Sequence, residues 1–268
     1  MRSFEAIFLV YLVYLAALAA GNRPVPLSRD RRWRVCAWLG AGGGAVLAAQ
    51  RLRGGWGAGL RDLMPFCYIL IGYRSAGLFF VRPSPRIETW LEGVDARLGI
   101  ARLAARQPGP LAAYLEASYL GIHLLIPAGL AALCLGAGRG SAQLFWNIVL
   151  SAELICYGCL PWIQTRPPRL LRAAPAPPRG GGTLIQRANL FVLRHGGLEA
   201  NTFPSGHAAG ALAVSLAVGS LMPAVGLVFL LAAASVAAGA VLGRYHYTVD
   251  SVAGALLAVL VWAVVGLG

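Results

Sequence analysis

The segment His-Tyr-Thr-Val-Asp at residues 246–250 carries a pair of side chains suited to catalysis. His246 and Asp250 are four residues apart, so a helix places them on one face within contact. A carboxylate bonded to one imidazole nitrogen fixes the tautomer and leaves the other nitrogen to attack or to abstract a proton. The pair therefore predicts a nucleophile or a base. The alternative is an interfacial histidine beside an aspartate that caps a membrane helix.

A second segment, Phe-Pro-Ser-Gly-His at 203–207, comes directly before a long apolar run. Pro204 favours the first turn of a helix. The N–H groups of Ser205, Gly206 and His207 are then expected to be the unpaired donors of a helix N-terminus, which is a natural phosphate site. Gly206 also removes a side chain where a phosphate must approach. This segment predicts phosphate binding.

The third segment, Thr-Arg-Pro-Pro-Arg at 165–169, follows an apolar run instead of preceding one. Arg166 and Arg169 present planar forks of donors that match phosphate oxygens. The alternative is the positively charged flank of a membrane helix, which is common at such positions. Taken alone, this segment does not decide between the two.

The composition sets the environment of these residues. Of 268 residues, 58% are hydrophobic and 12% are charged, whereas soluble domains average about 45–50% apolar and about 25% charged. A soluble enzyme and a disordered chain are therefore excluded. All 23 cationic residues are arginines and the net charge is +13, which favours anionic lipid headgroups over nucleic acid as the partner. A lysine-free chain is also typical of a GC-rich genome. We expect a multi-pass protein of a bacterial cell membrane, and its protein partners stay open.

Apolar windows of about 20 residues predict an all-α, multi-pass transmembrane bundle. We expect eight spans, at residues 4–20, 35–50, 63–81, 111–137, 143–162, 205–221, 223–242 and 249–267. Apolar residues every three or four positions within 82–110 predict a helix on the membrane surface. Prolines and glycines at 174–182 predict a loop, before a mixed pattern at 184–194.

The order of these spans brings the three motif segments together. If the fifth span exits on one face, the loop after it and the start of the sixth span share that face. The sixth span crosses and the seventh returns, so the turn at 243–248 lies there too. All three segments are therefore predicted to meet at one membrane face.

Charged residues also fall inside the predicted spans, where a lone charge costs about 2.5–3.5 kcal/mol by insertion scales. We expect Arg74 to pair with Glu116 or Glu153 inside the bundle. Glu116, Tyr119 and His123 share one helical face. A structural pairing and a role in substrate binding are both open for these residues.

In this order, TRPPR, PSGH and HYTVD resemble the three signature motifs of the type 2 phosphatidic acid phosphatase superfamily. The resemblance covers the last six predicted spans. It implies a six-helix phosphatase-type core at 62–268 after a two-helix membrane extension at 1–61. It also implies a reaction without metal through a phosphohistidine intermediate.

The resemblance assigns a role to each motif residue. His246 corresponds to the nucleophile, Asp250 to its orienting partner, and His207 to the acid that protonates the leaving alcohol. The residues that correspond to phosphate ligands are Arg166, Arg169, Ser205 and Gly206.

Two positions depart from the phosphatase branch. That branch has a lysine before its first Arg-Pro and an arginine six residues before the nucleophile; this chain has no lysine, and the second position is Ala240. Arg244, two residues before His246, is the candidate replacement. The PPR and HYTVD spellings resemble the inositol-phosphorylceramide and sphingomyelin synthase branch, which transfers headgroups between lipids, whereas PSGH is the phosphatase spelling.

The residues themselves are consistent with chemistry that uses no metal and no cofactor. Glu199 and Asp250 are the only carboxylates after residue 168, so this part of the sequence offers no acidic cluster for magnesium. Two histidines, an aspartate and several arginines supply a nucleophile, a proton donor and charge stabilisation.

We therefore predict an enzyme that hydrolyses or transfers the phosphoryl group of a lipid-linked phosphate ester arriving from the bilayer, in phospholipid or sphingolipid metabolism. The alternatives are an anion or lipid-phosphate transporter and an inactive lipid-phosphate-binding protein. The side of the membrane stays open, since the arginine bias favours a cytoplasmic active site and the resemblance implies an extracytoplasmic one.

Overall fold

A computed structural model describes residues 1–171, 185, 187, 189, 191 and 200–266, and these are largely helical. The helices are α1 (Ser3–Gly21), α2 (Arg29–Arg51), α3 (Gly54–Gly77), α4 (Pro85–Arg97), α5 (Ile100–Ala105), α6 (Gly109–Leu120), α7 (Ile122–Gly136), α8 (Ser141–Cys159), η1 (Pro168–Leu170), α10 (Gly206–Leu221), α11 (Pro223–Leu242) and α12 (Thr248–Gly266). The all-α prediction is confirmed. The predicted loop at 174–182 and most of the pattern at 184–194 lie outside the described residues.

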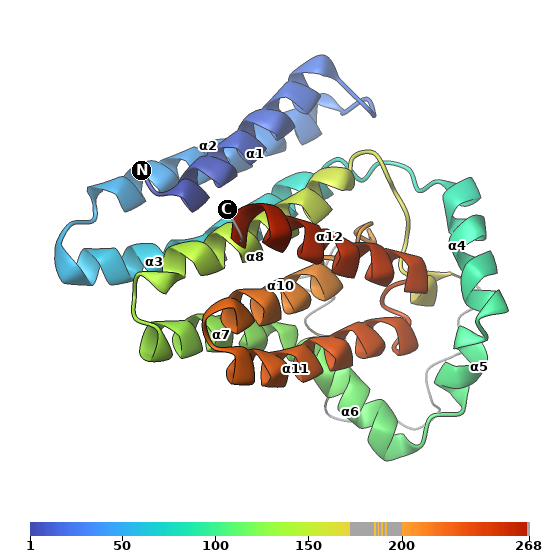
Figure 1. Ribbon diagram of the computed structural model, residues 1–268. Helices are drawn as coiled ribbons and strands as arrows, with labels where there is room; N and C mark the ends of the chain where they lie inside the picture. The colour runs from blue at the N-terminus through green and yellow to red at the C-terminus, as the bar shows by residue number, and fades with distance from the viewer. Residues whose placement is uncertain (172–184, 186, 188, 190, 192–199, 267–268) are drawn as a thin grey trace.

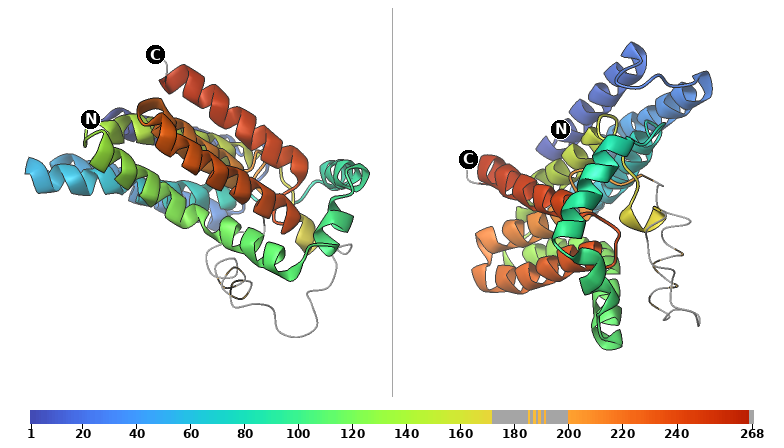
Figure 2. Two further views of the ribbon diagram at one scale, coloured as in Figure 1. Left: turned by 60° about the horizontal axis from the view of Figure 1, so that its bottom comes forward. Right: turned by 90° about the vertical axis from the view of Figure 1, so that its right-hand side faces the viewer.

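The long helices run along a common direction and α4 lies across one end of them (Figure 1). Helices α1 and α2 form an antiparallel pair along one flank, against α3 and α8 (Figures 1 and 2). Helices α10, α11 and α12 form the opposite side (Figure 1). The crosswise α4 agrees with the surface helix that its apolar spacing predicts.

Helix α10 lies at the centre of the second half, in contact with α7, α8, α11 and α12. Ser205 caps its N-terminus by accepting a hydrogen bond from the Ala208 N–H at 3.3 Å. Most side chains of α10 are alanine, glycine or valine and are buried on several faces. Small side chains allow the neighbouring helices to approach closely. The helix that begins with the PSGH motif is therefore packed among four other helices.

Within the described residues, four helices are long and apolar enough to cross a membrane: α1, α8, α11 and α12. The pair α6–α7, bent by 58° at its break, gives a fifth if it counts as one span, and α10 is apolar but shorter. Large apolar side chains stay exposed on the outer faces of these helices, as lipid contact requires, among them Leu124, Leu231, Leu256 and Val264. The chain is a multi-pass membrane protein.

The predicted count of eight spans is not reached, although a helix lies at each predicted position. Helices α2 and α3 are not apolar enough to count as membrane spans because they carry charged residues, which in α3 include Arg61 and Asp62. The Arg61 guanidinium donates to both oxygens of Glu5 at 2.6 and 2.7 Å, and Arg2 pairs with Asp62. These pairs join α1 to α3. Helix α3 is continuous across the expected boundary between 61 and 62, and the division into extension and six-helix core stays a prediction.

Gly254 of α12 lies directly against the backbone of α10. A Cβ atom at Gly254 would collide with the carbonyl oxygen of Ser205 and lie 3.3 Å from the Ala209 nitrogen. We expect Gly254→Ala to destabilise the protein by about 1–3 kcal/mol, because backbone atoms must move apart. The measurement is thermal unfolding in detergent, followed by intrinsic fluorescence.

The matched control is Gly44→Ala in α2, where an added Cβ has nothing within 4 Å. Alanine is the better helix former, so this change is expected to be neutral or to stabilise by about 0.5–1 kcal/mol. Equal effects of the two substitutions would contradict the close contact between α10 and α12.

Candidate active site

His246 and Asp250 form a buried pair at the start of α12. The His246 Nδ1 lies 3.1 Å from the Asp250 Oδ2, and the two residues are 5% and 0% exposed. Because a carboxylate accepts, Nδ1 carries the proton and Nε2 carries the lone pair. The His246 backbone N–H donates to the Ala240 carbonyl at 2.9 Å, which holds the turn before the helix. The predicted contact between the two side chains is present.

Asn201 is a site residue that the sequence analysis missed. Its Nδ2 lies 2.6 Å from the Asp250 Oδ2 and 3.2 Å from the Thr165 Oγ1. Its backbone N–H donates to the Thr165 carbonyl at 2.7 Å, in an isolated antiparallel bridge. Asn201 thus joins the TRPPR segment to the HYTVD segment. Its position four residues before Ser205 was the only available signal, and that spacing specifies no partner.

The N-terminus of α10 differs from the prediction. The Ser205 N–H donates to the Asp250 carbonyl at 2.9 Å, and the Gly206 N–H donates to the Thr202 Oγ1 at 3.2 Å. Two of the donors expected to be unpaired are therefore bonded, because a buried helix end needs partners for its free N–H groups. The contact from Ser205 also fixes α10 against α12.

A column of stacked groups connects the three motif segments. The Arg169 guanidinium carbon lies 4.3 Å from the Tyr245 ring centre, and the Tyr245 and Tyr119 rings stack at 3.9 Å with 5° between their planes. Tyr119 in turn stacks on His207 at 4.5 Å. The ring centres of His207 and His246 are 5.4 Å apart. The column therefore holds His207 beside His246.

Glu116 is hydrogen-bonded to this column through Tyr245. The Tyr245 hydroxyl donates to the Glu116 Oε2 at 2.5 Å, and the Asn189 amide donates to the same oxygen at 2.5 Å. Burial, together with this hydrogen bond to Glu116, raises the pKa of Tyr245, which keeps it a neutral donor. Within the described residues, the predicted pairing of Arg74 with Glu116 is not among the ion pairs. Sequence reasoning placed Tyr119 on the same face as Glu116 but missed Tyr245.

Glu153, the other predicted partner of Arg74, is buried in α8 next to α10. Its carboxylate occupies the space that a side chain at Gly206 or Gly210 would need. Two small residues, one turn apart, therefore make room for a buried carboxylate beneath the PSGH motif. An Arg74–Glu153 pair is likewise not among the ion pairs of the described residues.

The two arginines of the TRPPR segment have different surroundings. Arg166, expected to hold phosphate, forms a bidentate pair with Glu88 of α4, with Nε–Oε1 at 3.0 Å and Nη2–Oε2 at 2.8 Å. Arg169 donates its backbone N–H to the Arg244 carbonyl at 3.2 Å. The Nε atoms of Arg169 and Arg244 are buried without a hydrogen-bond partner in the described part of the chain. Arg169 and Arg244 therefore each keep a buried side-chain donor that no described residue satisfies.

Helix α4 caps the N-terminus of α12 from outside. The Asp95 Oδ1 accepts the Thr248 N–H at 3.0 Å, which supplies the N-terminus of α12 with an acceptor. Burial raises the pKa of Asp95, and the nearby Asp250 carboxylate adds to this effect. The Tyr247 hydroxyl donates to the Arg166 carbonyl at 3.1 Å. The crosswise helix therefore fixes both the first and the third motif segments.

A family comparison agrees with this arrangement. The model of the PAP2 superfamily matches residues 86–264, which is more than half of the chain and includes all three motif segments. The chain belongs to the PAP2 superfamily. Membership indicates an enzyme of the phosphatase type, acting by phosphoryl transfer. No curated protein and no solved structure gives a match.

Asn201→Ala is expected to reduce turnover by about 10- to 100-fold, since hydrogen bonds to charged groups contribute about 1.5–3 kcal/mol. The loss of the amide leaves the Asp250 carboxylate less firmly oriented toward His246. The measurement is kcat for phosphate release. Asn147→Ala is the control, because Asn147 accepts from Ser3, elsewhere in the bundle. Equal activity of the two variants would contradict the role of Asn201.

The Glu88–Arg166 pair predicts a dependence of stability on pH. Burial alone raises the pKa of Glu88, but the hydrogen bonds from Arg166 outweigh it and hold the pKa below its ordinary value. The pair therefore stabilises the fold above the ordinary glutamate pKa of about 4.3, and this contribution is lost as pH falls through the lowered value.

The test compares thermal midpoints of wild type and Glu88→Gln across a pH series. We expect the variant to be less stable at neutral pH and the difference to shrink in acid, because the wild-type carboxylate becomes protonated. A constant difference at every pH would show that the ion pair does not stabilise the fold.

Proposed function

We propose that this PAP2-superfamily member is an integral-membrane enzyme that cleaves or transfers the phosphoryl group of a lipid-linked phosphate ester, with His246 as the nucleophile. The observation that carries the proposal is the buried His246–Asp250 pair, whose ring lies 5.4 Å from that of His207. A neutral imidazole oriented by a carboxylate, beside a second imidazole, suits nucleophilic attack with general-acid assistance.

In the first step, the Nε2 lone pair of His246 attacks phosphorus and the bond from phosphorus to the lipid oxygen breaks. His207 gives its proton to the departing oxygen, which leaves as an alcohol. The Nδ1–H···Asp250 hydrogen bond stabilises the positive charge that forms on the His246 ring. Arg169 and Arg244, whose Nε atoms are buried, bind the phosphoryl oxygens.

In the second step, a hydroxyl oxygen attacks phosphorus and the P–N bond breaks, which restores His246. His207 accepts the proton of the attacking hydroxyl. Water as the acceptor gives hydrolysis, and a lipid alcohol gives headgroup transfer as in the inositol-phosphorylceramide and sphingomyelin synthase branch. The chain's own residues provide the nucleophile, the acid and the cations for both outcomes, so the proposal requires no metal.

The lipid substrate is proposed to enter from the bilayer at the end of the bundle crossed by α4 (Figure 1). At that end, Asp95 and Glu88 hold the polar segments in place, while exposed apolar side chains cover the spanning helices. This arrangement suits a substrate with a polar phosphate and apolar chains. A soluble phosphate ester has no apolar chains to contact the exposed apolar side chains of the helices.

The test uses purified full-length protein in detergent with excess EDTA. Phosphatidic acid and phosphodiester lipids are offered with and without diacylglycerol or ceramide as acceptors, and free phosphate and new phospholipids are measured. We expect product from at least one substrate, and a loss of about 10³-fold or more in His246→Ala with an unchanged thermal midpoint. Phosphate release identifies a phosphatase, and a transferred headgroup identifies a synthase.

Three outcomes would contradict the proposal. Turnover that survives His246→Ala would overturn the nucleophile, and turnover abolished by EDTA and restored by a divalent cation would overturn the metal-free reaction. Absence of any product, together with anion or lipid-phosphate transport by reconstituted protein that persists in His246→Ala, would favour the transporter.

A further inference from the structure

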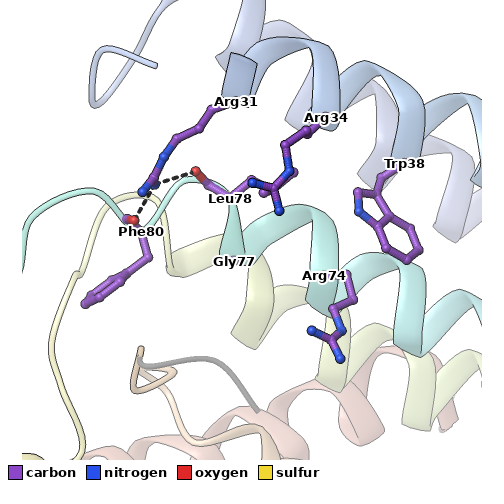
Figure 3. Close-up of a pocket in the computed structure, with 7 residues that line it drawn as sticks. All are labelled: Arg31, Arg34, Trp38, Arg74, Gly77, Leu78 and Phe80. Atoms are coloured by element: carbon purple, nitrogen blue, oxygen red, sulfur yellow. Dashed lines mark hydrogen bonds between the residues drawn. The ribbon is translucent and has the colours of Figure 1, made fainter. Parts of the chain in front are cut away.

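A pocket separate from the three motif segments lies between the first half of α2 and the end of α3. Its volume is about 290 Å³, and its lining includes Arg31, Arg34 and Trp38 of α2 and Leu78 and Phe80 after α3 (Figure 3). The lining residues include three arginines, the third being Arg74, and no carboxylate. The pocket is therefore positively charged and suits an anion.

Arg31 and Arg34 extend from α2 toward the end of α3 and line the pocket with positive charge (Figure 3). Arg31 Nη1 donates to the carbonyls of Leu78 at 3.1 Å and Phe80 at 2.6 Å, which fixes the guanidinium. Among the described residues, its Nε and Nη2 remain as donors. Arg34 is 62% exposed, and its ion pair with Asp30 is long, at 3.9 Å. A loose, exposed pair of this kind contributes little and leaves Arg34 able to bind an anion.

An apolar groove continues from this pocket along α2. It has a volume of about 310 Å³ and shares Arg34 and Trp38 with the pocket, while its other lining residues are Ala37 and Ala41. The two alanines are one turn apart and exposed, so they leave a furrow beside the Trp38 ring. A positive pocket and an apolar furrow thus lie end to end and share two residues.

The pocket lies at the same end of the bundle as the motif segments. The chain from its rim continues to Val81 and Arg82, whose N–H groups donate to the Gln164 side chain at 2.8 and 2.9 Å. Gln164 directly precedes the TRPPR segment. The furrow therefore runs from the polar end of α2 toward the middle of the helix, which is the direction of a lipid chain that enters a bilayer.

We propose that this groove binds one phosphate-bearing membrane lipid at a site distinct from the catalytic centre. The phosphate lies between Arg31 and Arg34, and an acyl chain lies along Ala37 and Ala41 beside Trp38. Charge complementarity selects a lipid phosphate over an uncharged lipid, and the furrow selects a lipid over inorganic phosphate. The lipid is bound without being converted, since no motif residue lines the groove.

The test is native mass spectrometry of the full-length protein carrying His246→Ala, which separates binding from turnover. Phosphatidylglycerol, diacylglycerol with the same chains, and inorganic phosphate are titrated separately. We expect phosphatidylglycerol to be retained and the other two probes to bind more weakly. Adding Arg34→Gln is expected to weaken phosphatidylglycerol binding about tenfold or more, since it removes a charged donor to the phosphate.

Arg29→Gln is the matched control, because it removes one exposed arginine at the same end of α2 but outside the groove. Ala41→Leu fills the furrow and is expected to weaken phosphatidylglycerol binding while leaving inorganic phosphate unaffected. Equal losses from Arg29→Gln and Arg34→Gln would overturn the site in favour of diffuse attraction. Equally tight binding of inorganic phosphate, unaffected by Ala41→Leu, would overturn the lipid as occupant.

Discussion

The hydrogen bonds of the buried Asp250 carboxylate are the interactions on which the rest of the candidate active site depends. The Asp250 Oδ2 accepts hydrogen bonds from His246 and from Asn201. The backbone carbonyl of the same residue accepts one from the Ser205 N–H. These three bonds join the start of α12, the segment before α10 and the cap of α10. A buried carboxylate needs hydrogen-bond donors in place of water, and His246 and Asn201 supply them at Oδ2.

The helices around this carboxylate are built to bring those partners close. Gly254 lets α12 contact the Ser205 carbonyl, and the glycines of α10 leave room for Glu153 of α8. Outside the bundle, α4 holds the segments next to Asp250. Its Asp95 accepts a hydrogen bond from Thr248, and its Glu88 accepts one from Arg166. Polar residues are thus held at one end of an apolar bundle in two ways. Helices α10 and α12 are in close backbone contact inside it, and α4 binds the motif segments from outside.

The sequence was sufficient wherever local spacing determines geometry. The interval of four residues predicted the His246–Asp250 contact, and the alternation of spans predicted that three distant segments would meet. It was insufficient wherever a partner comes from elsewhere in the fold. Asn201, the Arg166–Glu88 pair and the occupied N–H groups of Ser205 and Gly206 depend on tertiary positions that no spacing encodes. The count of eight spans is not confirmed, since α2 and α3 carry charged residues and are not among the described helices that are long and apolar enough to cross a membrane.

The most direct test of this account is to trap the phosphorylated protein. Wild-type chain, mixed with a ³²P-labelled lipid phosphate on which it turns over, is quenched in alkali within the first turnover and digested for peptide mapping. The account predicts a label that is stable in alkali, labile in acid and located on His246, and absent from His246→Ala. Full turnover with no labelled protein, or a label on another residue, would contradict the account.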